Sequence, residues 1–218
     1  MEKLFNLIIN KDGSIGIGAM IVFIAMVLVA GIAASVLIQT STKLEAQAMT
    51  TGTQTIDEVA GGLAVYDIEG HVATDIDALA ITVRTRAGSP NIDLNHSIII
   101  LTDSSTKTVL RYNYSNIKHY NSSVSTSDAS VFGFAYANLT NEVYGILVIS
   151  DPDSSLSRFT PVMNAGDYVM LFVDTDACFS KIGERTEVFG WVYPEHGSPG
   201  VISFTAPSSY SDTVYDLQ

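Results

Sequence analysis

The dominant hydropathy pattern in the chain is a long uncharged stretch near its start. No Asp, Glu, Lys or Arg occurs from residue 13 to residue 42, and the 24 residues at 15–38 are nearly all apolar. A helix of that length spans roughly 36 Å, which is enough to cross the hydrocarbon core of a bilayer. Because such a helix is apolar on every side, it needs lipid or other protein helices around it.

The helical pattern continues beyond this stretch in an amphipathic form. Gly52 weakens the middle of the continuation by about 1 kcal/mol relative to alanine, and Gly61-Gly62 is a strong stop signal. We therefore predict one helix over residues 15–60, roughly 70 Å long. Apolar residues recur in its second half at helical spacing, with polar residues between them, at Leu37, Leu44, Ala48, Ile56, Val59 and Leu63.

After Gly62 the pattern changes from helical to alternating, which is typical of strands. Residues 115–130 are polar and Ser-rich, and we expect them to form a long exposed loop. One helix followed by about eight short strands predicts an α+β chain, in which a long hydrophobic N-terminal helix precedes an antiparallel β-sandwich or barrel of immunoglobulin-like type over residues 63–218. The strand candidates, rich in Val, Ile, Tyr and Phe, are residues 79–85, 97–101, 108–114, 131–136, 144–150, 168–174, 186–193 and 201–205.

Three kinds of segment compete for the apolar stretch. A secretory signal peptide has an apolar core of roughly 7–15 residues, so this run is too long for one. A transmembrane anchor fits its length, and so does a segment that stays in the mature chain after a cut upstream. Association of helices in lipid depends on close packing, which needs small residues. The candidates for helix packing are Gly16, Gly18, Ala30, Gly31, Ala34 and Ser35.

The N-terminal sequence supports the third kind of segment. Residues 16–41, GIGAMIVFIAMVLVAGIAASVLIQTS, closely resemble the N-terminal segment of archaeal flagellins, or archaellins, and residues 189–210 resemble the C-terminal part of that family. The resemblance implies that a prepilin/preflagellin-type peptidase removes the leader, residues 1–13, by cutting between Gly13 and Ser14. Residues 14–62 then form the core and assembly helix. A basic residue often precedes the glycine in that family, whereas this chain has Asp12.

The resemblance also implies a function and a set of partners. An archaellin is a structural filament subunit that serves swimming motility and adhesion. It is inserted in the cytoplasmic membrane as a precursor, and a membrane platform and an assembly ATPase then transfer it to an extracellular homo-oligomeric helical filament. Type IV pilins usually carry Glu at the fifth mature position, where this chain has Gly18. The alternatives are an adhesion pilin of the same secretion class and a membrane-anchored, stator-like accessory protein.

Composition narrows the partners further. The chain carries 23 acidic and 11 basic side chains, a formal net charge of −12. Because binding to phosphates needs clustered Lys and Arg, nucleic acid is not an expected partner. The single cysteine, Cys178, excludes an intramolecular disulfide and follows an apolar run, which predicts a buried inert thiol.

Four Asn-x-Ser/Thr sequons predict N-linked glycans if the chain is exported. They fall within residues 95–140, and the predicted helix has none. Asn121 lies in the predicted exposed loop and is the first candidate, whereas Asn95 adjoins an apolar strand and is the last. Archaellins, which this chain resembles, are N-glycosylated. The four predicted acceptors are Asn95, Asn113, Asn121 and Asn138.

Catalytic and metal-binding patterns are absent from the sequence. Asp151-Pro152-Asp153 and Asp174-Thr175-Asp176 each place two carboxylates two residues apart, but neither has EF-hand spacing, and we interpret both as acidic turns. The four histidines are dispersed, and no HExxH or Gly-x-Ser-x-Gly motif occurs. We therefore predict no catalytic residue, no metal site and no cofactor.

Overall fold

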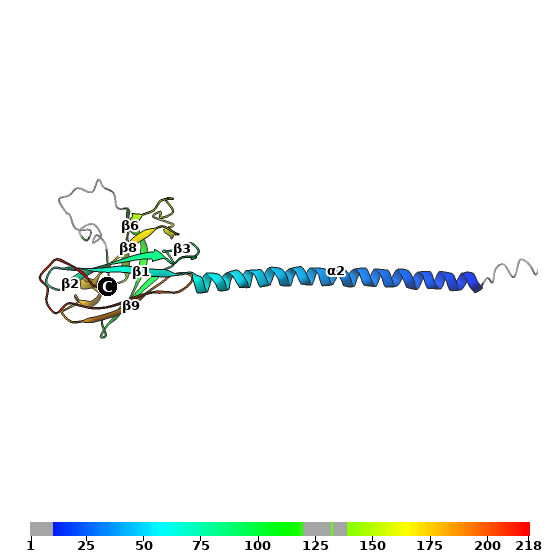
Figure 1. Ribbon diagram of the computed structural model, residues 1–218, viewed down its shortest axis with the longest axis horizontal. Helices are drawn as coiled ribbons and strands as arrows, with labels where there is room; N and C mark the ends of the chain where they lie inside the picture. Colours follow the sequence, from blue (N-terminus) through cyan, green and yellow to red (C-terminus); the bar gives the residue numbers. More distant parts are fainter. Residues whose placement is uncertain (1–10, 120–131, 133–138) are drawn as a thin grey trace, which may run out of the picture. The chain divides into compact units, whose positions relative to one another are not determined.

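The computed structural model describes residues 11–119, 132 and 139–218. Its first element is one long helix (Figure 1). Helix α2 spans Lys11–Ala60 and is continuous over 50 residues. The sequence predicted a start at residue 15, and the helix instead begins four residues earlier, so that Gly13 and Ser14 are helical. The chain divides into two compact units, Met1–Thr53 and Gln54–Gln218.

The glycine pair ends α2 as predicted. The amide of Gly61 donates to the carbonyl oxygen of Asp57 at 2.9 Å. Gly62 has φ +128°, and a Cβ at this position would collide with the backbone of Ser198. Gly197, with φ +83°, is equally close to Gly61. The chain therefore leaves the helix through a junction in which only glycine fits.

A nine-stranded sheet follows, in the order β10-β9-β4-β5-β6-β8-β2-β1-β11. A separate two-stranded ladder joins β3 (Ile92–Asp93) to β7 (Val162–Met163), and the short helix α4 (Thr175–Phe179) follows β8. The strands of the large sheet are β1 (Leu63–Val72), β2 (Ile76–Thr85), β4 (Ile98–Thr102), β5 (Lys107–His119), β6 (Val143–Ser150), β8 (Tyr168–Asp174), β9 (Glu187–Tyr193), β10 (Gly200–Thr205) and β11 (Val214–Asp216).

The large sheet curls so that one of its faces encloses the main core. β1 and β10 stand far apart in the strand order, yet they contact each other, and Gly62 forms a bridge to Ser198. This unit has a hydrophobic core of its own, and burial of each large apolar side chain in it stabilises the fold by about 1.5–3 kcal/mol. The fully buried side chains include Leu79, Ile81, Ile99, Leu101, Leu171, Val188 and Val192.

A second, smaller core covers the outer face of β2, β6 and β8. Ala78 and Ala80 of β2 meet Leu147 of β6 and Phe172 of β8, and Phe132 closes the cluster. The rings of Phe132 and Phe172 meet edge to face, with centroids 5.9 Å apart. β2 is therefore buried on both faces, which explains why its sequence is a nearly continuous apolar run.

The sheet is antiparallel, as predicted, apart from one pair of strands. β5 and β6 run parallel, with Tyr112 opposite Tyr144. A parallel pair needs a crossover of a dozen or more residues. The long segment between β5 and β6 is what permits this pairing.

Seven of the eight predicted strands coincide with observed ones, and the remaining differences are local. The predicted strand at 131–136 lies outside the described residues except for Phe132, which is helical. The predicted loop at 115–130 is wrong for residues 115–119, which continue β5, and its other residues lie outside the described chain. Strands β1, β3, β7 and β11 were not predicted from the sequence. β1 carries acidic residues among its apolar ones, and the other three have only two or three residues each.

Candidate functional site

The apolar half of α2 is not covered by any other described part of the chain. Residues 15–38 are all exposed, and fifteen large apolar side chains among them are about half to 70% exposed, such as Ile15, Phe23 and Leu37. The window that makes this helix a candidate membrane span is 0% buried and has a mean hydropathy of 3.0. Leaving these side chains in water forgoes on the order of 20–40 kcal/mol of burial. The helix therefore requires an apolar partner.

The predicted packing residues are Gly, Ala and Ser, whose small side chains leave depressions in the surface of this helix. We call these depressions shallow places. A Cβ added at Gly16, Gly18 or Gly31 would meet nothing within 4 Å. Ala30 and Ala34 are four residues apart, as are Gly31 and Ser35, so each pair lies on one side of the helix. These shallow places let another helix approach closely, although no helix does so within the described residues.

The second half of α2 carries hydroxyl groups that bond to the helix itself. Thr40 donates to the carbonyl oxygen of Leu37 at 2.9 Å, and Thr50 donates to that of Ala46 at 2.9 Å. Thr42 does the same toward Ile38 and Gln39, at 3.1 Å each. These bonds satisfy the hydroxyls, so the polar half can also lie against neighbouring chains without leaving them unpaired.

The predicted cleavage bond lies in the first turn of α2. Gly13 and Ser14 are helical, and residues 1–10 of the predicted leader lie outside the described residues. The division into leader, assembly helix and outer domain at residues 13 and 62 stays a prediction. The structure ends α2 at Ala60 and begins β1 at Leu63.

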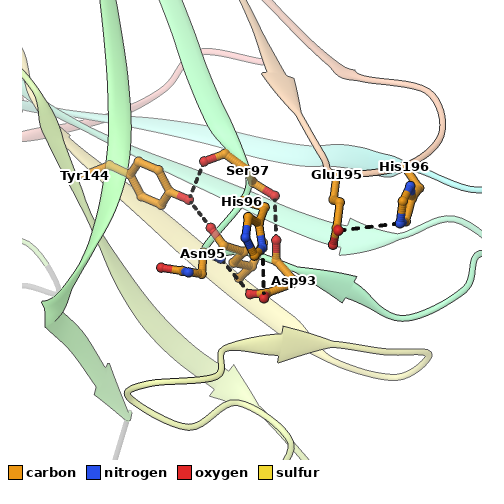
Figure 2. Close-up of polar contacts among 8 residues, drawn as sticks. Asp93, Asn95, His96, Ser97, Tyr144, Glu195 and His196 are labelled. Atoms are coloured by element: carbon orange, nitrogen blue, oxygen red, sulfur yellow. Dashed lines mark hydrogen bonds and ion pairs between the residues drawn. The ribbon is translucent and has the colours of Figure 1, made fainter.

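The first sequon is held in a hydrogen-bonded turn between β3 and β4 (Figure 2). The carboxylate of Asp93 accepts from the amide of Asn95 at 2.8 Å and lies 3.1 Å from Nδ1 of His96. Ser97, which is 1% exposed, donates to the carbonyl oxygen of Asp93, and the buried hydroxyl of Tyr144 donates to that of Ser97 at 3.3 Å. Asn95 is therefore exposed, but the Ser97 hydroxyl of its sequon is buried.

The second described sequon lies on β5. Asn113 is exposed, and with Asn95 it lines one groove of about 600 Å³ that also includes Arg111, Tyr112 and Glu142. The structure thus brings together two predicted acceptors that are 18 residues apart in the sequence. Asn121 and Asn138 lie outside the described residues.

One acidic pair acquires a third carboxylate that the sequence analysis missed. Asp151, Asp153 and Asp167 each place one carboxylate oxygen within 4.8 Å of the others. Oδ2 of Asp167 accepts from the amide of Asn164 at 2.8 Å, whereas its buried Oδ1 has no partner among the described atoms. Burial, reinforced by the charges of Asp151 and Asp153, raises the pKa of Asp167. Three converging oxygens could hold a hard cation, and the buried position of Asp167 in the turn before β8 gave no sequence signal.

The other acidic pair has a structural role. Asp174 caps α4, since its Oδ1 accepts from the amide of Ala177 at 3.0 Å. Cys178 in that helix is half-buried, and burial raises the pKa of its thiol to about 12, which leaves it protonated at neutral pH. Each of three histidines lies beside one carboxylate, in the pairs His71–Asp77, His96–Asp93 and His196–Glu195.

Comparisons with known proteins agree with the features of the helix. The family model for archaeal-type flagellin matches residues 13–204. Flagellin B2 of Methanocaldococcus jannaschii is 42% identical over 217 residues, covering 99% of both chains, and flagellin B3 of Thermococcus kodakarensis is 37% identical, covering 96% of this chain and 99% of its own. These flagellins match this chain along nearly its whole length.

Two solved structures share the fold. The crystal structure of archaeal flagellin FlaB1 from M. jannaschii has a TM-score of 0.62 and 35% identity, covering 73% of this chain and 98% of its own. A chain from the archaeal flagellum of Methanospirillum hungatei strain JF1 has a TM-score of 0.60 at 14% identity and covers 93% of this chain and 98% of its own. The chain therefore belongs to the archaeal-type flagellin family, a family of structural proteins.

Proposed function

We propose that this chain, a structural subunit of the archaeal flagellum filament, polymerises through the apolar half of α2 at the cell surface. The observation that carries this proposal is that residues 15–38 are exposed on every side of the helix, with small residues where a second helix would approach. Copies of the same helix offer apolar surface and matching shallow places. The β-rich unit has its own core and forms the outer part of each subunit.

Before assembly the same helix holds the precursor in the cytoplasmic membrane. Its length and hydropathy suit a membrane span. Transfer from lipid to a helix bundle brings no gain from the hydrophobic effect, so close packing at Ala30, Gly31 and Ala34 must favour the bundle. A membrane platform and an assembly ATPase supply the work of extraction.

Maturation is a cut between Gly13 and Ser14 by a preflagellin-type peptidase. Removing the leader takes the charged side chains of Glu2, Lys3, Lys11 and Asp12 away from the start of the apolar helix and leaves one α-amino group at Ser14. An N-terminus without these charges enters a helix bundle at a lower desolvation cost.

The test of maturation is Gly13→Val. We expect the precursor to accumulate in membranes and the sheared fraction to contain no filaments, because a bulky residue blocks the peptidase. The matched control is Asp12→Lys, which places a basic residue before the glycine and should mature normally. Normal filaments from the Gly13→Val strain would refute the cleavage site, and normal swimming of a deletion strain would favour the adhesion pilin.

N-linked glycans on the outer domain are the second part of the proposal. Asn95 and Asn113 are exposed, which supports modification, and Asn121 and Asn138 are further acceptors by sequence. Because Ser97 is buried after folding, a glycan on Asn95 must be attached before the β3–β4 turn forms. Mass spectrometry of filament glycopeptides tests each position. An Asn that is unmodified in wild-type filaments is not a glycan acceptor.

A further inference from the structure

Among the described residues, side chains cover one half of the outer face of the large sheet and leave the other half bare. Phe132 covers β2, β6 and β8, as described above. On β5, β4, β9 and β10 the outward positions include apolar side chains that remain accessible beside polar ones, with Trp191 38%, Phe189 40% and Val201 53% exposed. We call the second region the bare face, made of Ile100, Val109, Phe189, Trp191, Tyr193 and Val201.

Strand register makes the bare face continuous. Val109 lies opposite Ile100, Ile100 opposite Trp191, and Trp191 opposite Val201, so one row crosses four strands. Tyr193 widens the row, with its ring centroid 6.5 Å from that of Trp191. Neighbouring strands lie about 4.8 Å apart, so this row is roughly 14 Å wide. A continuous apolar surface of this kind on a folded domain marks a contact with another macromolecule.

The charges beside the bare face differ from those of the rest of the domain. Lys107 and Arg111 flank Val109 on the same side of β5, and both are exposed. The outward positions of β9 add one acid, Glu187. Residues 54–218 as a whole carry 20 acidic and 8 basic side chains. Glu142 lines one groove with Val109 and Arg111, so two acids balance the two bases beside the bare face. The bare face is therefore less acidic than the rest of the domain, and its exposed Lys107 and Arg111 suit an acidic partner.

The same domain offers such a surface on β1 and β11. Glu69 lies directly opposite Asp216, and like charges in that position repel each other. Burial and the neighbouring carboxylates raise the pKa of both Asp67 and Glu69. Tyr66, 64% exposed, and Val214, 41% exposed, add apolar area. We call Asp67, Glu69 and Asp216, with these two side chains, the acidic strip.

We infer that the bare face of one subunit docks on the acidic strip of a second copy of this chain. The inference rests on the proposed filament and names a contact between outer domains in addition to the helix bundle. The two surfaces lie on opposite ends of the strand order, so the contact is heterologous. A heterologous contact that does not close into a ring propagates into a helical polymer, as a filament requires. Lys107 and Arg111 of one copy relieve the repulsion within the acidic strip of the next.

Charge reversal tests the contact in whole filaments. In low salt, we expect Lys107→Glu/Arg111→Glu filaments to release at least tenfold more subunit on warming than wild-type filaments. Adding Asp67→Lys/Asp216→Lys should restore wild-type release. The matched control, Arg158→Glu/Arg185→Glu, makes the same change in net charge at exposed residues outside the bare face and should release little. Wild-type release from the first variant, or failure of the second pair to rescue it, overturns the inference.

Trp191 provides an independent readout because it is the only tryptophan of the chain. In wild-type filaments we expect acrylamide, a quencher without charge, to quench its fluorescence at least fivefold less than that of N-acetyltryptophanamide, and quenching should increase in the Lys107→Glu/Arg111→Glu filaments. Quenching that is equal in the two kinds of filament overturns the contact even if filaments form normally. Absence of wild-type filaments by electron microscopy would instead refute the proposed filament function.

Discussion

The two units of this chain differ in where their large apolar side chains are placed. In the β-rich unit, large apolar side chains such as Leu79, Ile81 and Leu171 are completely buried by their own chain. In α2, side chains of the same kind are about half to 70% exposed, including Ile15 and Leu37. One unit covers its apolar side chains within the chain, and the other leaves them for a partner to cover.

This difference separates folding from assembly. A change in the core of the β-rich unit alters the free energy of unfolding of each subunit. A change on the apolar half of α2 leaves that free energy alone and alters the association of subunits. Variants chosen from the two regions should therefore show opposite patterns in an unfolding assay and a filament assay.

The largest effect is expected from Gly31→Leu on α2. A leucine side chain fills the shallow place where a second helix approaches, so filaments should be lost almost completely. The thermal unfolding midpoint of the β-rich unit should not change, because nothing lies within 4 Å of a Cβ at this position. Electron microscopy of sheared material and circular dichroism measure the two quantities. Val29→Leu, at an already large side chain, is the control, and abundant Gly31→Leu filaments would contradict helix packing at this position.

In the β-rich unit, Tyr144→Ala should have the opposite pattern. Tyr144 is 0% exposed, and its hydroxyl donates to Leu94 and Ser97. Truncation leaves a cavity and should lower the free energy of unfolding by about 3–5 kcal/mol. Tyr144→Phe, which removes only the hydroxyl, should lower it by about 1–2 kcal/mol. Denaturant unfolding of the mature chain measures both, and equal losses would show that packing around the ring is not the main contribution.

The junction after α2 gives an intermediate effect with an internal control. Gly88 and Gly197 share φ +83°, but a Cβ at Gly88 would meet nothing, whereas one at Gly197 would collide with the backbone of Gly61. Gly88→Ala should cost about 1 kcal/mol from backbone strain alone. Gly197→Ala should cost about 2–4 kcal/mol because the junction must also move. Equal unfolding midpoints for the two variants would mean that the close approach does not constrain the junction.

A structural feature of this molecule could be predicted from the sequence where residues close together in the chain determine it. The apolar stretch of α2 and the stop at Gly61-Gly62 are local features, and both were predicted. Most strands were also found, because Val, Ile and aromatic residues alternate within them. The pairing of β5 with β6 was not predictable, since it depends on a crossover and not on local pattern.

The candidate sites divide in the same way. Sequons are local motifs, so all four candidate acceptors could be named from the sequence, but their exposure depends on the fold. Asp151 and Asp153 were visible as a pair, whereas Asp167 joins them only because β8 pairs antiparallel with β6, with Tyr168 opposite Ser150. The bare face was invisible in the sequence because its residues alternate with core residues on every strand that contributes to it.

Removal of the buried charge at Asp167 should have a smaller effect, which depends on cations. In chelator, Asp167→Asn should raise the unfolding midpoint by a few degrees, because the repulsion from Asp151 and Asp153 disappears. Millimolar calcium should raise the midpoint of the wild type and leave that of Asp167→Asn unchanged. Ser155→Ala, which removes a donor to Asp167 but keeps all three carboxylates, is the control. Equal calcium responses in wild type and Asp167→Asn would exclude a cation at this cluster.

The smallest effect expected is the pH dependence of the acidic strip. Burial, followed by repulsion from neighbouring carboxylates, raises the pKa of Asp67 above 3.8 and that of Glu69 above 4.5. A raised pKa means that the folded state binds the proton more tightly, so these groups stabilise the fold once protonated. Their contribution is complete below the ordinary values and is lost as the pH rises through the folded ones. Glu69→Gln should flatten this part of the midpoint-against-pH curve, and an unchanged slope would contradict the assigned repulsion.

The central claim is that the apolar half of α2 moves from the membrane into a bundle of the same helices from other subunits. The most direct test is mass spectrometry of the N-terminus, performed in parallel on sheared lipid-free filaments and on membranes. We expect filament subunits to begin at Ser14 and the membrane fraction to contain the longer chain that begins at Met1. Mature chains confined to the membrane fraction, or filaments built of chains that retain Met1, would contradict assembly through a processed helix.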